Sequence, residues 1–135
     1  MIIHALRLNP NDDLKKSILE FAQTHQISAG CILTGLGSLK ISNLRFASKK
    51  QGAVISGFQE IVSFTGTFSN SAGHFHISLA NENGNVSGGH LLDGNLIHTT
   101  AEIVMLQLPD FKFNREYDQN TGYKELAIVV SSDKL

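Results

Sequence analysis

The spacing of apolar residues predicts one amphipathic helix near the N-terminus. The residues that recur at three- and four-residue intervals are Leu14, Ile18, Phe21 and Ala22. This spacing places side chains on a single helix face. Asn11 and Asp12 precede the run and are residue types that cap helices and favour the positive end of the helix dipole. We expect the helix to end near His25. Residues 2–8, which precede the helix, are expected to form a strand.

After Gly30 the helical spacing gives way to short runs rich in β-branched and aromatic residues. There are eight such runs: CILTG, LKISNLRFA, GAVISGF, EIVSFTGTF, HFHISLA, NVSGGH, LIHTTAEIVMLQL and ELAIVV. One helix followed by strands with hairpin-length connections predicts an α+β fold, a mostly antiparallel β-sheet packed with one main N-terminal α-helix as a single-domain sandwich over residues 1–135. The turn-forming residues 120–122 predict that the last strand returns to the sheet.

Composition narrows the class of protein. A chain of 135 residues with 41% hydrophobic and 17% charged residues can bury a core, which excludes a disordered tail or a membrane span. The single Cys31 excludes an internal disulfide framework, and the N-terminus lacks the pattern of a secretory signal, so we expect a cytoplasmic protein. The net charge of -1 argues against a broad basic face for nucleic acid.

The candidate chemistry lies in the segment 73–80, with the sequence GHFHISLA. Alternate residues of a strand face the same way, so its three large apolar residues share one face. His74 and His76 then project together from the other face, at a spacing that can offer two imidazoles to one metal ion. The alternative is a pair of solvated histidines on the polar face of an amphipathic strand.

A third imidazole, His90, lies on the next predicted strand, and the register of the hairpin decides whether it joins the pair. A two-residue loop at Asn83 and Gly84 puts His90 opposite Ile77, on the wrong face. A three-residue loop puts it opposite Ser78, diagonally near the pair. A bulge at residues 88–89, which are both glycine, repairs the first register by the same shift. We therefore expect one backbone irregularity before His90, although the glycines equally fit positions of close packing.

Three neutral imidazoles with an open fourth position are typical of a catalytic or ligand-binding zinc-type site. The predicted metal ligands are His74, His76 and His90, and the expected ion is divalent, with zinc favoured. Such an ion lowers the pKa of a bound water toward ~7 and polarises a carbonyl or phosphoryl oxygen. The hypothesis includes a hydrolase-like or lyase-like enzyme, with the substrate unassigned.

Two carboxylates are candidates for the acid or base beside such an ion. Glu60 and Glu102 lie beside or inside apolar runs, where an ionised side chain is costly unless it is paired. A buried ion pair with Arg45 or Arg115 is the alternative.

The other histidines have plainer interpretations. His98 is either a fourth imidazole or a solvated strand residue, and the latter is favoured. His25 suits the carbonyl end of the helix as a cap. His4 is expected to be a structural or surface residue, and Cys31 is expected to be a small core residue.

These residues carry a resemblance to a known family. The string H-F-H-I-S-L-A-x-x-x-G-x-V-x-G-G-H-L-x-x-G, followed by T-A-E at 100–102, resembles the PPC (plants and prokaryotes conserved) domain, which in plants accompanies AT-hook DNA-binding motifs. Shorter matches run along the whole chain: A-L-R-L at 5–8, G-S-L at 37–39, L-R-F at 44–46, E-I-V-S-F-T-G at 60–66 and D-x-x-T-G-Y-x-E-L at 118–126. The resemblance implies an α/β sandwich assembled as a homotrimer, with the histidines of H-x-H and G-G-H grouped as a metal site.

The resemblance also offers DNA as a partner, and here the sequence departs from the family. The AT-hook is built on an Arg-Gly-Arg-Pro core, whereas the two prolines, Pro10 and Pro109, have no neighbouring arginine. The nearest basic cluster is 45–50, which would make few phosphate contacts. A DNA-binding regulator is therefore the alternative function.

Three hypotheses follow for the function. The first is a homotrimer that binds a divalent metal or small ligand through its three histidines, and the second is the DNA-binding regulator. The third is a structural or partner-binding trimer in which histidine and glycine serve packing. The run 102–108 is largely apolar on both strand faces, as expected for a strand covered by its own helix and by a neighbouring subunit, or for the central strand of a monomer.

Overall fold

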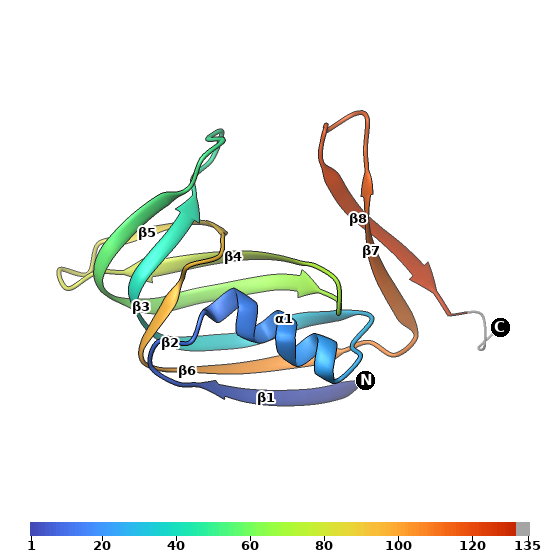
Figure 1. Ribbon diagram of the computed structural model, residues 1–135, viewed down its shortest axis with the longest axis horizontal. Coiled ribbons are helices and arrows are strands. Elements are labelled where there is room, and N and C mark those ends of the chain that lie inside the picture. The colour runs from blue at the N-terminus through green and yellow to red at the C-terminus, as the bar shows by residue number, and fades with distance from the viewer. Residues whose placement is uncertain (132–135) are drawn as a thin grey trace.

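The computed structural model describes residues 1–131 and consists of one helix and eight strands (Figure 1). In chain order these are β1 (Ile2–Leu8), α1 (Leu14–Thr24), β2 (Gly30–Arg45), β3 (Ala53–Phe68), β4 (Gly73–Ala80), β5 (Val86–Leu91), β6 (Leu96–Gln107), β7 (Phe111–Tyr117) and β8 (Lys124–Val130). Every strand pair in this part of the chain is antiparallel. The α+β class with a mostly antiparallel sheet is confirmed.

Helix α1 begins one residue later than the expected caps imply. Asp13 is the N-cap, and its side chain accepts a hydrogen bond from the backbone N–H of Lys16 at 3.1 Å. The apolar stripe is buried as predicted, and its fully covered residues are Leu14, Ile18 and Ala22. His25 is the C-cap, with a ring nitrogen 2.9 Å from the Phe21 carbonyl oxygen, which confirms its capping role.

Six strands form one sheet in the order β1-β6-β2-β3-β4-β5. β2 and β3 each have 16 residues and each join two of the runs in the sequence. Register shifts along β2 bend it, so that its last residues pair with β5 at the far edge of the sheet. β2, β3, β4 and β5 therefore close into a ring, while α1 covers the part of the sheet near β6 (Figure 1).

The core lies between the helix and the covered face of the sheet. The Phe75 ring stacks on those of Phe64 and Phe68, with centroids 5.6 and 6.2 Å away, and all three residues are buried. Phe75 lies between the two histidines of β4 in the sequence and is fully buried. Because neighbouring strand residues point to opposite faces, burial of Phe75 directs both histidines away from the core.

The predicted return of the last strand to the main sheet is wrong. β7 and β8 pair only with each other in a separate two-stranded sheet, which projects from the body of the molecule (Figure 1). The turn at 120–122 is present, with Gly122 at a φ of 75° and its N–H bonded to the Asp118 carbonyl oxygen at 2.8 Å. That turn makes a hairpin, and the partner of β8 is therefore the adjacent strand and not the sheet.

The helix found in residues 1–131, α1, has 11 residues and is too short to span a membrane.

Two glycines of the main sheet provide a matched test of how closely β2 packs against β6. Gly37 and Gly57 both have a positive φ, 138° and 126°, so an alanine is strained at either position. At Gly37 the added Cβ would also overlap the carbonyl oxygen of Thr100 and approach the Cα of Ala101 to 2.6 Å, whereas at Gly57 no atom lies within 4 Å. We expect Gly57→Ala to lower the free energy of unfolding by about 1–2 kcal/mol and Gly37→Ala by more than about 3 kcal/mol, measured by urea denaturation. Equal losses would show that the contact with β6 is not tight.

Candidate metal centre and adjoining cavity

The first two histidines lie side by side on β4, as predicted. Their Nε2 atoms are 3.2 Å apart, and the ring centroids are separated by 4.9 Å. Two nitrogen ligands bound to one tetrahedral zinc ion at the usual ~2.0–2.1 Å would lie ~3.3 Å apart. The spacing of His74 and His76 therefore already matches that of two ligands.

His90 joins the pair, but in a register that differs from both predictions. It lies on β5 directly opposite His76, and the pairing runs without a shift to Ala80 opposite Val86. The loop has three residues, 82–84, and ends at Gly84 with a φ of 76°. It therefore closes one residue earlier than a loop over 83–85 would.

The Asn81 side chain explains this early closure. Its Oδ1 accepts hydrogen bonds from the backbone N–H groups of Asn83 and Asn85, each at 3.0 Å. The backbone N–H of Asn81 also donates to the Asn85 carbonyl oxygen at 2.9 Å, so Asn81 and Asn85 form the last pair of the hairpin. The irregularity expected before His90 is not needed.

The two glycines of β5 are close-packing positions instead of a bulge. A Cβ at Gly88 would lie 2.5 Å from the carbonyl oxygen of Ile77, and one at Gly89 would lie 2.8 Å from that of Arg45. These carbonyls belong to β4 and β2, the two strands that flank β5. The glycines thus allow β5 to fit between its neighbours with His90 at the cluster.

The three imidazoles form a group whose candidate ligand atoms lie within 4.8 Å of one another. His90 is 4.9 Å from His74 and 5.8 Å from His76 between ring centroids. The Nδ1 of His90 is buried and has no hydrogen-bond partner in the described structure. A buried polar atom without a partner is costly, and a metal ion is one group that would satisfy it. The donor set therefore fits a divalent ion.

The electrostatic environment favours the neutral form of two of these imidazoles, those of His90 and His74. Burial lowers the pKa of His90 to about 4, and the neighbouring His74 and Arg45 add to that effect. Burial also lowers the pKa of His74, followed by the charges of His76 and Arg115, while Glu125 opposes the shift. Since only the neutral imidazole binds a metal, these residues need not lose a proton first at neutral pH.

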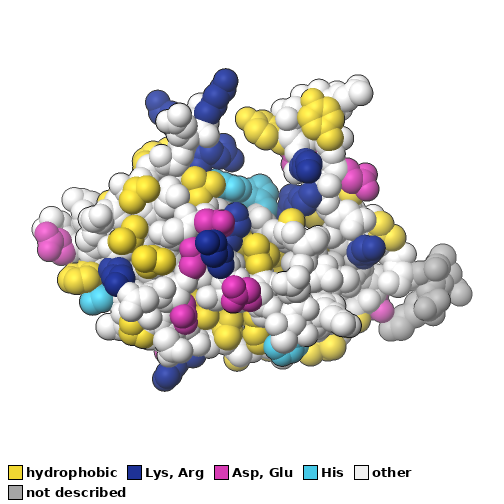
Figure 2. All heavy atoms as spheres, viewed as in Figure 1, with side chains coloured by type: hydrophobic (Ala, Val, Ile, Leu, Met, Phe, Trp, Pro, Cys, Tyr) yellow, Lys and Arg dark blue, Asp and Glu magenta, His cyan; other side chains and the backbone are white. Residues whose placement is uncertain are grey.

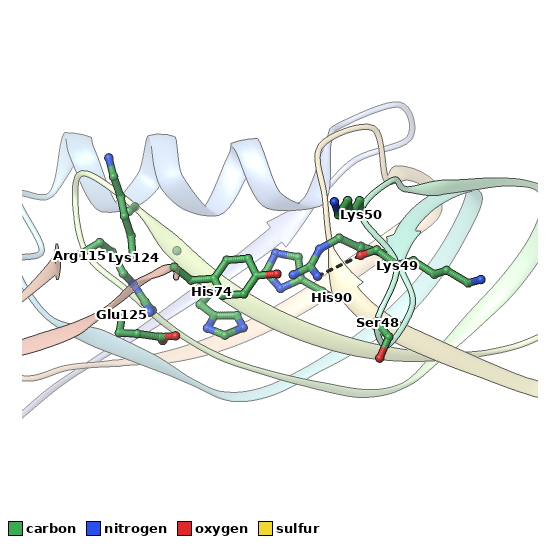
Figure 3. Close-up of a pocket in the computed structure, with 12 residues that line it drawn as sticks. Ser48, Lys49, Lys50, His74, His90, Arg115, Lys124 and Glu125 are labelled. Atoms are coloured by element: carbon green, nitrogen blue, oxygen red, sulfur yellow. Dashed lines mark hydrogen bonds between the residues drawn. The ribbon is translucent and has the colours of Figure 1, made fainter. Parts of the chain in front are cut away.

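The cluster opens into a cavity of about 590 Å³. Its lining residues come from the end of β2 and the β2–β3 connection, from β4 and the residue before it, from β5, and from the β7–β8 hairpin: Arg45, Ser48, Lys49, Lys50, Ala72, Gly73, His74, His90, Arg115, Tyr123, Lys124 and Glu125. Figure 2 shows histidine side chains on the floor of a hollow between two projections that carry Lys and Arg. Figure 3 shows His74 and His90 between Arg115 and Glu125 on one side and Lys49 and Lys50 on the other.

The predicted carboxylates are not part of this site. Glu60 and Glu102 are exposed, neither lines the cavity, and neither pairs with an arginine in the described structure. The carboxylate that lines the cavity is Glu125 of β8. No charge or spacing pattern in the sequence singles out Glu125, although it belongs to the D-x-x-T-G-Y-x-E-L string, which also contains Tyr123.

The remaining residues lie outside the cluster. His98 stacks on Phe58 with ring centroids 3.9 Å apart, and is not a fourth imidazole of the group. The Nε2 of His4 is hydrogen-bonded to Gln107 at 2.8 Å. Cys31 was expected in the core and is only half-buried, at the start of β2.

Sequence comparisons agree with the resemblance found in the histidine strings. The family model for the Plants and Prokaryotes Conserved (PCC) domain matches residues 1–109. A curated relative from a Synechococcus strain, named bifunctional protein GlmU, is 39% identical over 126 residues, which is 93% of this chain and 20% of that protein. The chain thus spans about a fifth of the length of that relative.

Solved structures share the fold over nearly the whole chain. A hypothetical protein from Salmonella enterica has a TM-score of 0.93 at 32% identity and covers 96% of this chain and 94% of its own. The metal-containing protein AF0104 from Archaeoglobus fulgidus has a TM-score of 0.76 at 26% identity, with 94% of both chains covered. A putative DNA-binding protein from Bacteroides thetaiotaomicron has a TM-score of 0.83 at 23% identity, covering 93% of this chain and 91% of its own. At that identity the similarity establishes a shared fold and no more.

The lowered pKa of His90 predicts how stability depends on pH in the metal-free protein. The unfolded chain takes up a proton on this residue as pH falls through about 6.5, whereas the folded chain does so only near about 4. Protons therefore favour the unfolded state between these values, and the free energy of unfolding falls as pH decreases from about 6.5 toward 4. We expect the free energy of unfolding, measured by urea denaturation, to decrease less between pH 7 and pH 5 in His90→Gln than in the parent. In His98→Gln it should decrease as much as in the parent. Parallel pH profiles for all three proteins would contradict the assignment.

Proposed function

Because this chain belongs to the Plants and Prokaryotes Conserved (PCC) domain family, we propose that it is a metal-binding member in which His74, His76 and His90 hold a divalent ion, with zinc the expected ion. The observation that carries the proposal is the convergence of the three imidazoles, whose candidate ligand atoms lie within 4.8 Å. The buried, unpartnered Nδ1 of His90 supports it. So does the metal content of the related archaeal protein, which shares the fold at 26% identity.

The cavity supports a role in binding or chemistry over a closed structural site. Structural zinc sites surround the ion with four protein ligands, whereas three histidines leave one position for water or a ligand. Here that position would open toward the cavity beside His74 and His90. When bound, such an ion supplies a polarising positive charge and an acidified water. Glu125 is placed to accept a proton or a hydrogen bond from a molecule in the cavity.

We also propose that the protein assembles as a homotrimer, as the family resemblance implies. The sheet face opposite α1 exposes large apolar side chains of β1, β2 and β3: Ile3, Leu33, Leu36, Phe58 and Val62 are 49–68% exposed. An apolar surface of this kind is typical of a protein interface. The apolar residues of β6 on this face are half-buried, and a neighbouring copy would cover them.

DNA binding is the second candidate, and one observation favours it. The β7–β8 hairpin brings Arg115 and Lys124 to the basic cluster at 45–50, so the positive charge of the described surface is more concentrated than the sequence order suggests. Phosphate contacts from such a patch would give salt-dependent binding. The histidines on the floor of the hollow have no evident part in that function.

The metal proposal predicts the effect of removing one imidazole. Protein purified without a His tag should hold about one equivalent of zinc per chain, measured by elemental analysis. His76→Ala should weaken zinc binding by more than about 100-fold. Removal of a residue that only hydrogen-bonds to a metal ligand already costs about 10–100-fold in metal affinity, and His76 would be a ligand itself. His98→Ala removes an imidazole outside the cluster and should keep the parent's zinc content. Equal, negligible metal in all three proteins would overturn the proposal.

The trimer proposal predicts the effect of a charge on the apolar face. Leu36→Glu should reduce the mass measured by light scattering from three chains to one, because an unpaired carboxylate at an interface is costly to desolvate. Lys16→Glu changes an exposed residue of α1 on the other side of the sheet and should leave the mass unchanged. A parent protein with the mass of one chain would refute the assembly.

A further inference from the structure

The cavity beside the histidines gathers an unusual share of the chain's positive charge. Of the eleven Lys and Arg residues in the sequence, five line it in the described structure, together with one of the twelve acidic residues. We infer that this cavity binds a small organic anion, whose carboxylate or phosphate group is held by Arg45 and Arg115 beside the three histidines. The inference deepens the proposed function, since it names the class of ligand that would meet the bound ion.

Arg45 is fixed next to His90 by the register of the sheet. The two residues are cross-strand partners on β2 and β5, and directly opposed residues project from the same face. The guanidinium group donates a hydrogen bond to the carbonyl oxygen of Lys49 at 3.4 Å, an interaction drawn as a dashed line in Figure 3. Arg45 has no ion pair with a carboxylate of the described residues, so its charge is free to meet a ligand.

Arg115 approaches the cluster from the opposite side. It lies on β7, and its Nη2 donates to the Thr67 hydroxyl at 3.2 Å. Thr67 is the cross-strand partner of His74, so this contact anchors the guanidinium beside the first imidazole. Arg115 likewise forms no ion pair within residues 1–131. Two guanidinium groups from different elements therefore flank the histidines.

The chemistry of these two residues selects an oxyanion. Guanidinium groups match the geometry of carboxylate and phosphate through paired N–H donors, and a hydrogen bond to a charged group is stronger than a neutral one. Lysine offers a single ammonium group without this paired geometry, and Figure 3 shows the Lys49 side chain extending away from His90. The lysines thus contribute a general positive field, which raises the local concentration of anions.

The size and lining of the cavity favour an organic molecule over a free oxyanion. A volume of about 590 Å³ lies within the range of small-molecule sites, roughly 300–1,000 Å³, and exceeds what inorganic phosphate would fill. Tyr123 and Ala72 add apolar surface, and Glu125 offers an acceptor for a hydroxyl or amino group. The recessed floor suits a small molecule better than a DNA duplex, whose phosphates lie on a convex surface.

The test is calorimetric titration of the full-length, zinc-loaded protein with glycerol 2-phosphate, succinate, inorganic phosphate and a 20-base-pair DNA duplex. We expect one of the two organic anions to bind at one per chain and more tightly than inorganic phosphate. Arg115→Gln and Arg45→Gln should each weaken that binding about 10- to 100-fold, the worth of a hydrogen bond to a charged group. Lys112→Gln removes a positive charge from the same strand as Arg115, outside the cavity lining, and should change the affinity less than twofold.

The outcomes separate this inference from the metal proposal. Zinc content and thermal unfolding are measured for every variant, so a lost metal or a lost fold is not mistaken for a lost anion site. Anion binding that persists in chelator-treated protein, with no zinc held by the parent, would support the anion site and reject the metal. Failure of both organic anions to bind, arginine variants that match Lys112→Gln, or tighter binding of DNA than of either anion would overturn the inference.

Discussion

The pairing of β5 with both β4 and β2 is the constraint on which the candidate site depends. It closes four strands into a ring, and it sets His90 opposite His76 on one side and opposite Arg45 on the other. Such close fitting is possible because Gly88 and Gly89 have no side chains, since a Cβ at either would crowd a backbone carbonyl of the flanking strands. The imidazole cluster and the first guanidinium are thus consequences of one stretch of backbone packing. Any change that displaces β5 would separate the two groups together.

The second half of the site comes from a different part of the fold. The β7–β8 hairpin stands apart from the main sheet, yet it supplies Arg115 and Glu125 to the cavity. Its attachment includes the hydrogen bond from Arg115 to Thr67 and one from the Phe113 N–H to the Ser28 carbonyl oxygen at 2.9 Å. The floor of the cavity is therefore built on the sheet, while one wall depends on a two-stranded hairpin with few such links.

The sequence was sufficient for the features that depend on local periodicity. The helix, the strand character and the common face of His74 and His76 follow from spacing alone, and the structure confirms them. The hairpin register was missed because it depends on the Asn81 side chain, which closes the loop one residue early. Glu125 was missed for a different reason. Spacing along the chain carries no information on where a hairpin outside the main sheet folds back, and only the family string marked that segment.

Charge links the two halves of the site. Burial and the charge of the neighbouring His76 lower the His74 pKa, and the guanidinium groups add to this shift. That imidazole is therefore free to bind a cation, but the positive charges of the guanidinium groups also repel a divalent ion. A metal bound here would therefore be favoured by an anion that neutralises Arg45 and Arg115. The anion would in turn gain attraction from the ion, because coupling between two binding sites is reciprocal. The two arginines would therefore raise the free energy of the state in which the ion is bound with water alone. They would lower the free energy of the state in which the ion and an organic anion are bound together.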